Sequence, residues 1–303
     1  MGSVKVWLHA FRLRTLPLSL SCIFIGSSLA FVNDAFDVVV FGLLIITTTL
    51  LQILSNLAND YGDTQHGADN HERLGPARAV QSGAITKEKI KASIFIFSIL
   101  CLISGISLLL FSFGLAQWKL ISEFFLLGIF AIIAAIKYTA GSNPYGYKGF
   151  GDVFVFLFFG LVGVLGSAFL YMKSFELSFV LPAMAIGMLS TGVLNINNIR
   201  DIEGDAKVGK NTIAVRLGRR NAGIYHLLLI IGSILSLGSY IVFFTEAIEA
   251  WAFLLLAPFL IKNIKTILCE KDALKIDKQL KVLALSSFFV SLLFSLGLII
   301  NRL

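Results

Sequence analysis

The twenty residues VVVFGLLIITTTLLQILSNL (38–57) decide the fold, because none of them carries a charge. About twenty apolar residues in a helix cross the hydrocarbon core of a bilayer while keeping every backbone group hydrogen-bonded internally. Comparable stretches recur along the chain. We predict nine spans: Thr15–Val32, Val38–Leu57, Ala92–Gly114, Leu120–Lys137, Val153–Met172, Leu177–Ile196, Ala222–Phe244, Trp251–Ile261 and Val282–Ile300.

The composition agrees with a membrane protein. Of 303 residues, 57% are hydrophobic and 14% are charged, whereas a soluble domain carries about 25% charged residues. The eighth stretch is short and is followed by Lys262, so eight spans are the alternative to nine. No segment between the spans is large enough to fold alone. We therefore expect an all-α membrane protein in which residues 1–303 form one transmembrane domain.

The basic residues predict the orientation, because Lys and Arg stay on the cytoplasmic side. With the N-terminus inside, all of the 25 basic residues except Lys119, Lys173 and Arg302 lie in inner segments. We expect a polytopic cell-membrane protein whose N-terminus and acid-rich loops face the cytoplasm. The net charge of +7 then reflects topology and an anionic ligand. Nucleic-acid binding would need a solvated basic surface, so it is excluded.

Two acid-rich clusters follow the second and the sixth predicted span. The first begins NLANDYGD (56–63), and the second is NINNIRDIEGD (195–205). Spacings of four residues put these side chains on one helix face. Oxygen ligands without His or Cys suit Mg²⁺, which binds a few carboxylates together with substrate phosphates. The predicted ligands are Asn59, Asp60, Asp63, Asp69, Asn197, Asp201 and Asp205.

The plainer interpretation is that these are ordinary carboxylates in cytoplasmic loops. Acids at a helix C-terminus oppose the helix dipole, however, and need compensation. Two matched clusters, each followed by basic residues, favour a functional site. RLGPARAVQSG (73–83) follows the first cluster and KVGKNT (207–212) the second. We predict that Arg78, Lys210 and Arg73 contact phosphate, whereas anchoring at the inner face accounts for the remaining basic residues of these loops.

A third inner loop, YTAGSNPYGYKGFGD (138–152), is rich in Gly and Tyr. Its glycines suggest a backbone that approaches a ligand closely. Tyr138 and Lys148 are the candidate site residues in this loop. The alternatives are that Tyr138 is an aromatic residue of the membrane interface and that Lys148 pairs with Asp152 four residues later.

These segments together resemble the UbiA-type intramembrane prenyltransferases. The resemblance rests on NDYGD (59–63), RLGPARAVQSG (73–83), NNIRDIEGD (197–205) and VRLG (215–218). RTLP (14–17) and YTAG…PYGY (138–147) are most similar to the branch that prenylates 1,4-dihydroxy-2-naphthoate in menaquinone biosynthesis. Many members carry a third acid where this chain has Gly67, and Asp69 fits the branch instead. The likeness runs from Arg14 to Gly218.

The resemblance implies a reaction. A polyprenyl group passes from an allylic polyprenyl diphosphate to 1,4-dihydroxy-2-naphthoate, CO₂ is lost, and a demethylmenaquinone forms with Mg²⁺ as cofactor. It also implies roles for individual residues. The catalytic set would be Asp63, Asp201, Arg78, Lys210 and Tyr138, and the diphosphate contacts would be Arg78, Lys210, Arg73, Lys148 and Arg14.

Three other functions compete with this one. The nearest is the same chemistry on 4-hydroxybenzoate or another aromatic acceptor. A membrane transporter with intramembrane acids is the second, but its acids should lie near the middle of spans, whereas these lie at the ends. A CDP-alcohol phosphotransferase concentrates its acids in one contiguous motif, and this chain has two distant ones.

Overall fold

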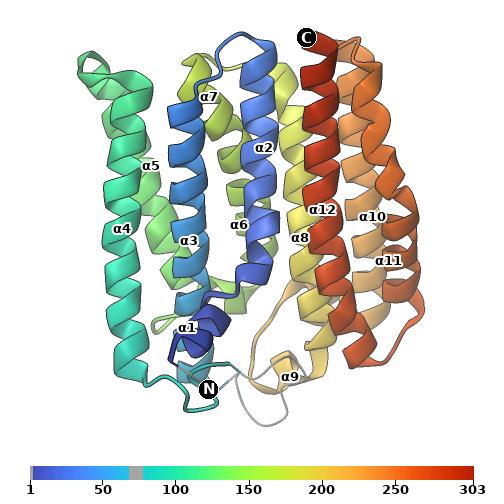
Figure 1. Cartoon of the computed structure of the whole chain (residues 1–303). Helices are drawn as coiled ribbons and strands as arrows, with labels where there is room; N and C mark the ends of the chain where they lie inside the picture. Colours follow the sequence, from blue (N-terminus) through green and yellow to red (C-terminus); the bar gives the residue numbers. More distant parts are fainter. Residues whose placement is uncertain (1–2, 68–77) are drawn as a thin grey trace.

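The computed structural model describes residues 3–67 and 78–303, and every regular element in these ranges is helical. The long helices run side by side, and the short helices α1 and α9 lie at one end of the bundle (Figure 1). The α-helices are α1 Ser3–Phe11, α2 Leu16–Val32, α3 Val38–Gln65, α4 Lys87–Phe113, α5 Trp118–Lys137, α6 Gly151–Val155, α7 Gly166–Met172, α8 Val180–Arg200, α9 Ile202–Lys207, α10 Ile213–Phe244, α11 Ala257–Cys269 and α12 Ala273–Arg302.

Shorter helical segments complete several of these elements. A π-helical segment, η4, joins α6 to α7 into one continuous span. The short segments are η1 Leu13–Thr15, η2 Leu115–Gln117, η3 Tyr145–Lys148, η4 Phe156–Leu165, η5 Leu177–Phe179 and η6 Ile248–Leu256.

Nine helices within the described ranges are long and apolar enough to cross a membrane, which confirms the predicted number of spans. The eighth runs over Ile248–Cys269 and begins as the 3₁₀ segment η6 before it continues as α11. The alternative of eight spans is therefore wrong for the described part of the chain. The hydropathy pattern underestimated the length of this span, because Lys262, Asn263 and Lys265 interrupt its apolar sequence.

The polar ends of the spans differ from the prediction of two acid-rich loops. Helix α3 continues to Gln65, so Asn59, Asp60 and Asp63 lie on its last turns and not in a loop. Asn197 lies within α8, Asp201 caps that helix, and Asp205 lies on the short α9. Tertiary contacts explain the longer α3. The Asn56 amide donates to the Phe11 carbonyl at 2.9 Å and to the Thr15 hydroxyl at 3.0 Å.

Helix α1 packs against the beginning of α4 and the end of α3. Its Phe11 ring lies 5.3 Å from that of Phe97, centroid to centroid. The buried residues of this small core include Ile53 and Leu57 of α3, together with Ala79 and Val80 of the segment that follows the undescribed residues. We call this group the α1 core. It fixes the N-terminal helix to the segment that carries Arg78.

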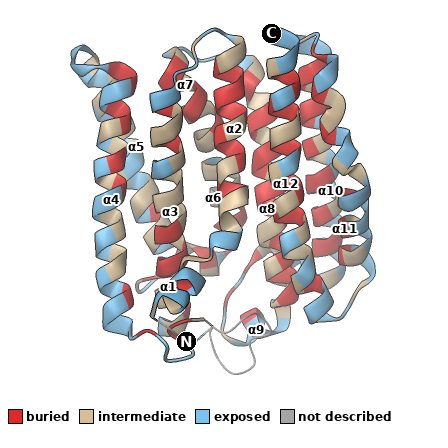
Figure 2. Cartoon of the chain, viewed as in Figure 1, coloured by how far each residue is buried: buried red, intermediate tan, exposed pale blue. Residues whose placement is uncertain are grey.

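Small residues let the C-terminal helices pack closely, as is usual inside membranes, where little hydrophobic force drives helix association. Gly297 of α12 faces the backbone of η6, and a Cβ atom there would lie 2.3 Å from the Ala250 Cα. Helix α8 is largely buried in the bundle, whereas α4 and α5 expose apolar side chains along their length (Figure 2). Those exposed side chains suit contact with lipid.

We expect Gly297→Ala to destabilise the bundle by about 1–3 kcal/mol, because the added methyl group must push η6 away from α12. The matched control is Gly42→Ala on α3, where a Cβ atom meets nothing within 4 Å. That change should be neutral or slightly stabilising, since Ala favours helix over Gly. Unfolding transitions in detergent micelles measure both. Equal stability of the two variants would contradict the close packing described here.

Candidate active site

The candidate site lies at the end of the bundle that holds α1 and α9, which we call the α9 face (Figure 1). Its first part is the end of α3. The Asp63 carboxylate lies 2.6 Å from Nη1 of Arg78. The same guanidinium nitrogen donates to the Asn59 carbonyl at 2.5 Å. Arg78 therefore compensates the Asp63 carboxylate, whose charge opposes the dipole at the end of α3, and also contacts the Asn59 carbonyl one turn earlier.

A glycine brings the loop after α5 onto the first acid cluster. A Cβ atom on Gly62 would lie 2.4 Å from the carbonyl carbon of Thr139, so only glycine permits this approach. The Thr139 hydroxyl donates to Asn59 Oδ1 at 3.1 Å and to the Ala58 carbonyl at 3.2 Å. The loop is thus fixed beside the acids by a close backbone contact and by a side chain that the sequence analysis did not single out.

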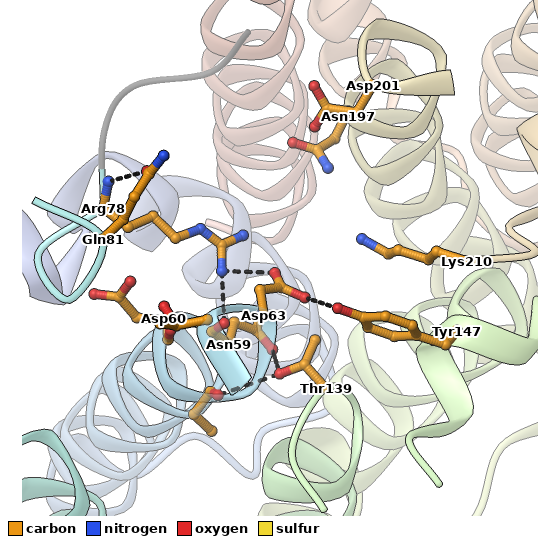
Figure 3. Close-up of polar contacts among 12 residues, drawn as sticks. Asn59, Asp60, Asp63, Arg78, Gln81, Thr139, Tyr147, Asn197, Asp201 and Lys210 are labelled. Carbon is orange, nitrogen blue, oxygen red and sulfur yellow. Dashed lines mark hydrogen bonds and ion pairs between the residues drawn. The ribbon is translucent and has the colours of Figure 1, made fainter. Parts of the chain in front are cut away.

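Tyr147 and Lys210 connect the first cluster to the second. The Tyr147 hydroxyl donates to Asp63 Oδ1 at 2.9 Å, and Lys210 Nζ lies 5.3 Å from the centroid of that tyrosine ring. The same ammonium group is 3.5 Å from Asp205 Oδ1. Burial, with the neighbouring Asp63, raises the pKa of Tyr147, so the phenol stays protonated and remains a donor. Figure 3 shows Lys210 pointing into the space between the two clusters.

In the second cluster, burial disfavours the ionised form of Asp205. Burial raises the pKa of Asp205 to about 6. Lys210 opposes this shift, whereas the carboxylates of Asp201 and Asp63 add to it. A buried acid whose ionised form is disfavoured in this way gains from a further cation nearby.

Two buried carboxylate oxygens at this end of the bundle have the chemistry to bind a divalent ion. Asp60 Oδ1 and Asp205 Oδ2 are buried without a hydrogen-bond partner, and buried acceptors of this kind need an explanation. Within residues 3–67 and 78–303, no three or more His, Cys, Asp or Glu side chains converge as a closed metal site. Mg²⁺ does not require one, since it is usually held by one or two carboxylates plus substrate phosphates.

Four of the predicted site residues are not joined to the clusters by contacts in the described part of the chain. Asp69 and Arg73 lie outside the described residues. Arg14 is exposed on η1, and within the described residues no hydrogen bond or ion pair joins its side chain to either cluster. Lys148 is exposed too, and its carbonyl accepts a hydrogen bond from Arg216 at 2.5 Å. The alternative that Lys148 pairs with Asp152 is wrong among these residues, because no such ion pair is present and Asp152 is buried. The proposed roles of Arg14 and Lys148 stay predictions.

Tyr138 follows the last residue of α5 and lines a cavity of about 400 Å³ that extends from the site into the bundle. Burial, with the nearby acids, raises the pKa of Tyr138 well above its usual value, so the phenol is neutral. The cavity wall beside it is aromatic. Tyr145 stacks on Phe154 with centroids 4.1 Å apart, and Phe158 continues this wall. Asn59 lies at the cavity mouth, and Leu108 and Phe124 line its far part.

A bundle of membrane helices in which Asn59 lines an apolar cavity and lies next to acids and cations at the α9 face is the architecture of an intramembrane enzyme for an amphiphilic substrate. The comparisons give its family. The model of the UbiA prenyltransferase family matches residues 19–293. A relative from Escherichia coli (strain K12), 1,4-dihydroxy-2-naphthoate octaprenyltransferase, is 42% identical over 303 residues, covering 100% of this chain and 97% of the relative. The chain therefore belongs to the UbiA prenyltransferase family.

Two solved structures share the fold. The apo structure of a UbiA homolog from Aeropyrum pernix K1 has a TM-score of 0.67 and 18% identity, covering 96% of this chain and 99% of that chain. A UbiA homolog from Archaeoglobus fulgidus bound to DMAPP and Mg²⁺ has a TM-score of 0.62 and 14% identity, covering 94% and 98%. The shared fold covers almost the whole chain, including its last three spans. By family, the chain is a polytopic membrane prenyltransferase.

The Gly62 contact gives a prediction. Gly62→Ala should lower the rate of prenyl transfer by about 10- to 100-fold, because the methyl group displaces the Thr139 loop and a shift of about 1 Å at a reacting centre has effects of that size. Gly42→Ala on the same helix is the control and should keep the wild-type rate. A Gly62→Ala enzyme with full activity would show that the loop position is unimportant.

Proposed function

We propose that this protein transfers a polyprenyl group from an allylic polyprenyl diphosphate to 1,4-dihydroxy-2-naphthoate. CO₂ is lost, and the product is a demethylmenaquinone. The observation that carries the reaction type is that two acid clusters and two cations, Arg78 and Lys210, meet at the α9 face, next to the Asn59 end of an apolar cavity. The full-length similarity to the Escherichia coli enzyme supports the choice of acceptor.

The diphosphate end of the donor would lie between the clusters. Asp60 and Asp63 on one side and Asp201 and Asp205 on the other would hold Mg²⁺, with Asn59 and Asn197 as further oxygen ligands. When bound, Mg²⁺ would supply positive charge to the phosphate oxygens. The Archaeoglobus fulgidus homolog, whose structure holds DMAPP with Mg²⁺, supports this assignment.

Arg78 and Lys210 would stabilise the leaving group. Negative charge grows on the diphosphate as the allylic C–O bond breaks, and cations fixed beforehand stabilise that charge without reorganising. Arg78 is already held by Asp63, and Lys210 lies between the Tyr147 ring and Asp205. The two cations come from segments that follow different clusters, so they would approach the diphosphate from separate sides.

The cavity would shield the allylic cation and receive the proximal part of the isoprenoid chain. Its lining is mostly apolar, which excludes water that would otherwise capture the cation. Tyr145 and Phe154 present aromatic faces beside the site, and such faces attract positive charge. The ring carbon that bears the carboxylate then forms the new C–C bond. Loss of CO₂ returns the bonding electron pair to the ring and restores its aromaticity.

We also propose that the α9 face is cytoplasmic. The basic residues support this orientation, since all but three of the 25 lie in segments predicted to be inside. Of those three, Arg302 lies at the opposite end of the bundle, where it pairs with Asp34 at 2.5 Å. A water-soluble acceptor would then reach the site from the cytoplasm, and the lipid donor would reach it from the bilayer.

One prediction of the proposed function concerns the acids of the two clusters. Asp63→Ala and Asp201→Ala should each lower turnover by at least about 100-fold, the scale seen when one preorganised electrostatic group is lost. Both proteins should still insert into membranes. Asp34→Ala, which removes an exposed acid from the opposite face, should keep its activity. The measurement is transfer of a labelled prenyl group by the purified proteins. Near wild-type turnover of either site variant would contradict the assignment of these acids to the site of prenyl transfer.

The second prediction concerns the acceptor. Purified protein supplied with a polyprenyl diphosphate, Mg²⁺ and 1,4-dihydroxy-2-naphthoate should form a prenylated naphthol that lacks the carboxylate, identified by mass spectrometry. With 4-hydroxybenzoate instead, little product should form. Chelation of divalent ions by EDTA should abolish product formation, and added Mg²⁺ should restore it. Efficient prenylation of 4-hydroxybenzoate with none of the naphthoate would reassign the acceptor.

A further inference from the structure

Arg200, the last residue of α8, is buried between the second acid cluster and the last helix. Its side chain is only 1% exposed, yet each of its three nitrogens has an acceptor. Nε donates to Asp201 Oδ1 at 2.8 Å, and Nη2 donates to Asp201 Oδ2 and to Asn197 Oδ1. Nη1 donates to Asp277 Oδ1 at 2.5 Å.

Asp277 brings the last helix into the site. It lies near the start of α12, 77 residues beyond Arg200 and outside both acid-rich motifs. Its side chain is 25% exposed, against 16% for Asp201. One buried guanidinium is therefore shared by two carboxylates, of which only Asp201 belongs to an acid-rich motif.

This sharing matters because each oxygen of Asp201 accepts a hydrogen bond from Arg200, so a metal ion and the guanidinium compete for the same carboxylate charge. A divalent ion at Asp201 must weaken those hydrogen bonds, as a carboxylate oxygen that binds a metal accepts less from a guanidinium. A buried guanidinium without a carboxylate is strongly unfavourable. Asp277 removes this obstacle, since Arg200 keeps one ionised partner when Asp201 turns toward the metal.

We infer that Asp277 is a positioning residue of the second acid cluster. It anchors Arg200 to α12, so that Asp201 and Asn197, both held by the same guanidinium, can exchange Arg200 for a divalent ion. Asp277 itself touches neither the metal nor the diphosphate. The inference rests on the proposed function in one respect, namely that Asp201 is a metal ligand.

The test measures metal binding directly. Full-length protein in detergent is titrated with Mn²⁺, and free Mn²⁺ is followed by its electron paramagnetic resonance signal, without any substrate. Asp277→Asn should weaken Mn²⁺ binding by about tenfold or more, the scale of one lost hydrogen bond to a charged group. Asp277→Glu keeps the charge and should restore most of the affinity. Asp272→Asn removes the same charge from the start of the same helix, where Asp272 caps the Leu274 amide at 2.9 Å, and should not change Mn²⁺ affinity.

Prenyl transfer gives a second readout. Asp277→Asn should raise the Mg²⁺ concentration needed for half-maximal rate, while saturating Mg²⁺ recovers most of kcat. A merely structural role would lower kcat and thermal stability at every Mg²⁺ concentration, and that result would overturn the inference. Unchanged Mn²⁺ affinity in Asp277→Asn would overturn it too. If wild-type protein shows no saturable Mn²⁺ binding and needs no divalent ion for transfer, the role of Mg²⁺ in the proposed function is wrong. The inference about Asp277 is then wrong too.

Discussion

The constraint on which the site depends is the cost of ionised carboxylates at the end of a membrane helix. Such groups lose hydration and oppose the helix dipole, so each needs a cation close by. The chain meets this need with cations that lie within or follow each acid cluster. Arg78 compensates Asp63 at 2.6 Å, Arg200 compensates Asp201, and Lys210 lies 3.5 Å from Asp205. Tyr147, which donates to Asp63 and lies beside Lys210, joins the end of α3 to the loop after α5 and to the segment after α9.

The sequence was sufficient for the spans, because uncharged stretches of about twenty residues are seldom compatible with any other structure. It was not sufficient for the helix ends. Residues 56–63 are rich in Asn, Asp and Gly, which in isolation favour a loop. They remain helical because Asn56 donates to Phe11 and Asn59 accepts from Arg78, contacts that span 45 and 19 residues and leave no local signature.

The sequence indicated the acid clusters and two cations, Arg78 and Lys210, as candidate site residues. The acids occur at helical spacings beside spans, and the cations follow them. The residues that connect them were missed. Tyr147 looked like one aromatic among several in a Gly-rich loop, yet it joins Asp63 to the Lys210 side chain. Arg200 lies between Asn197 and Asp201, but the orientation of the spans already accounts for its charge, so the sequence gives it no separate role. Its second carboxylate, Asp277, could be found only in three dimensions.

The α1 core has a consequence for biosynthesis. Residues of α1 precede in the chain the surfaces that they pack against, which come from α3, the Ala79–Ile85 segment and α4. Because synthesis runs toward the C-terminus, α1 cannot reach its final position until α3 and α4 have been made. The segment that carries Arg78 packs in the same α1 core, so this end of the bundle reaches its final packing only after those later helices are in place.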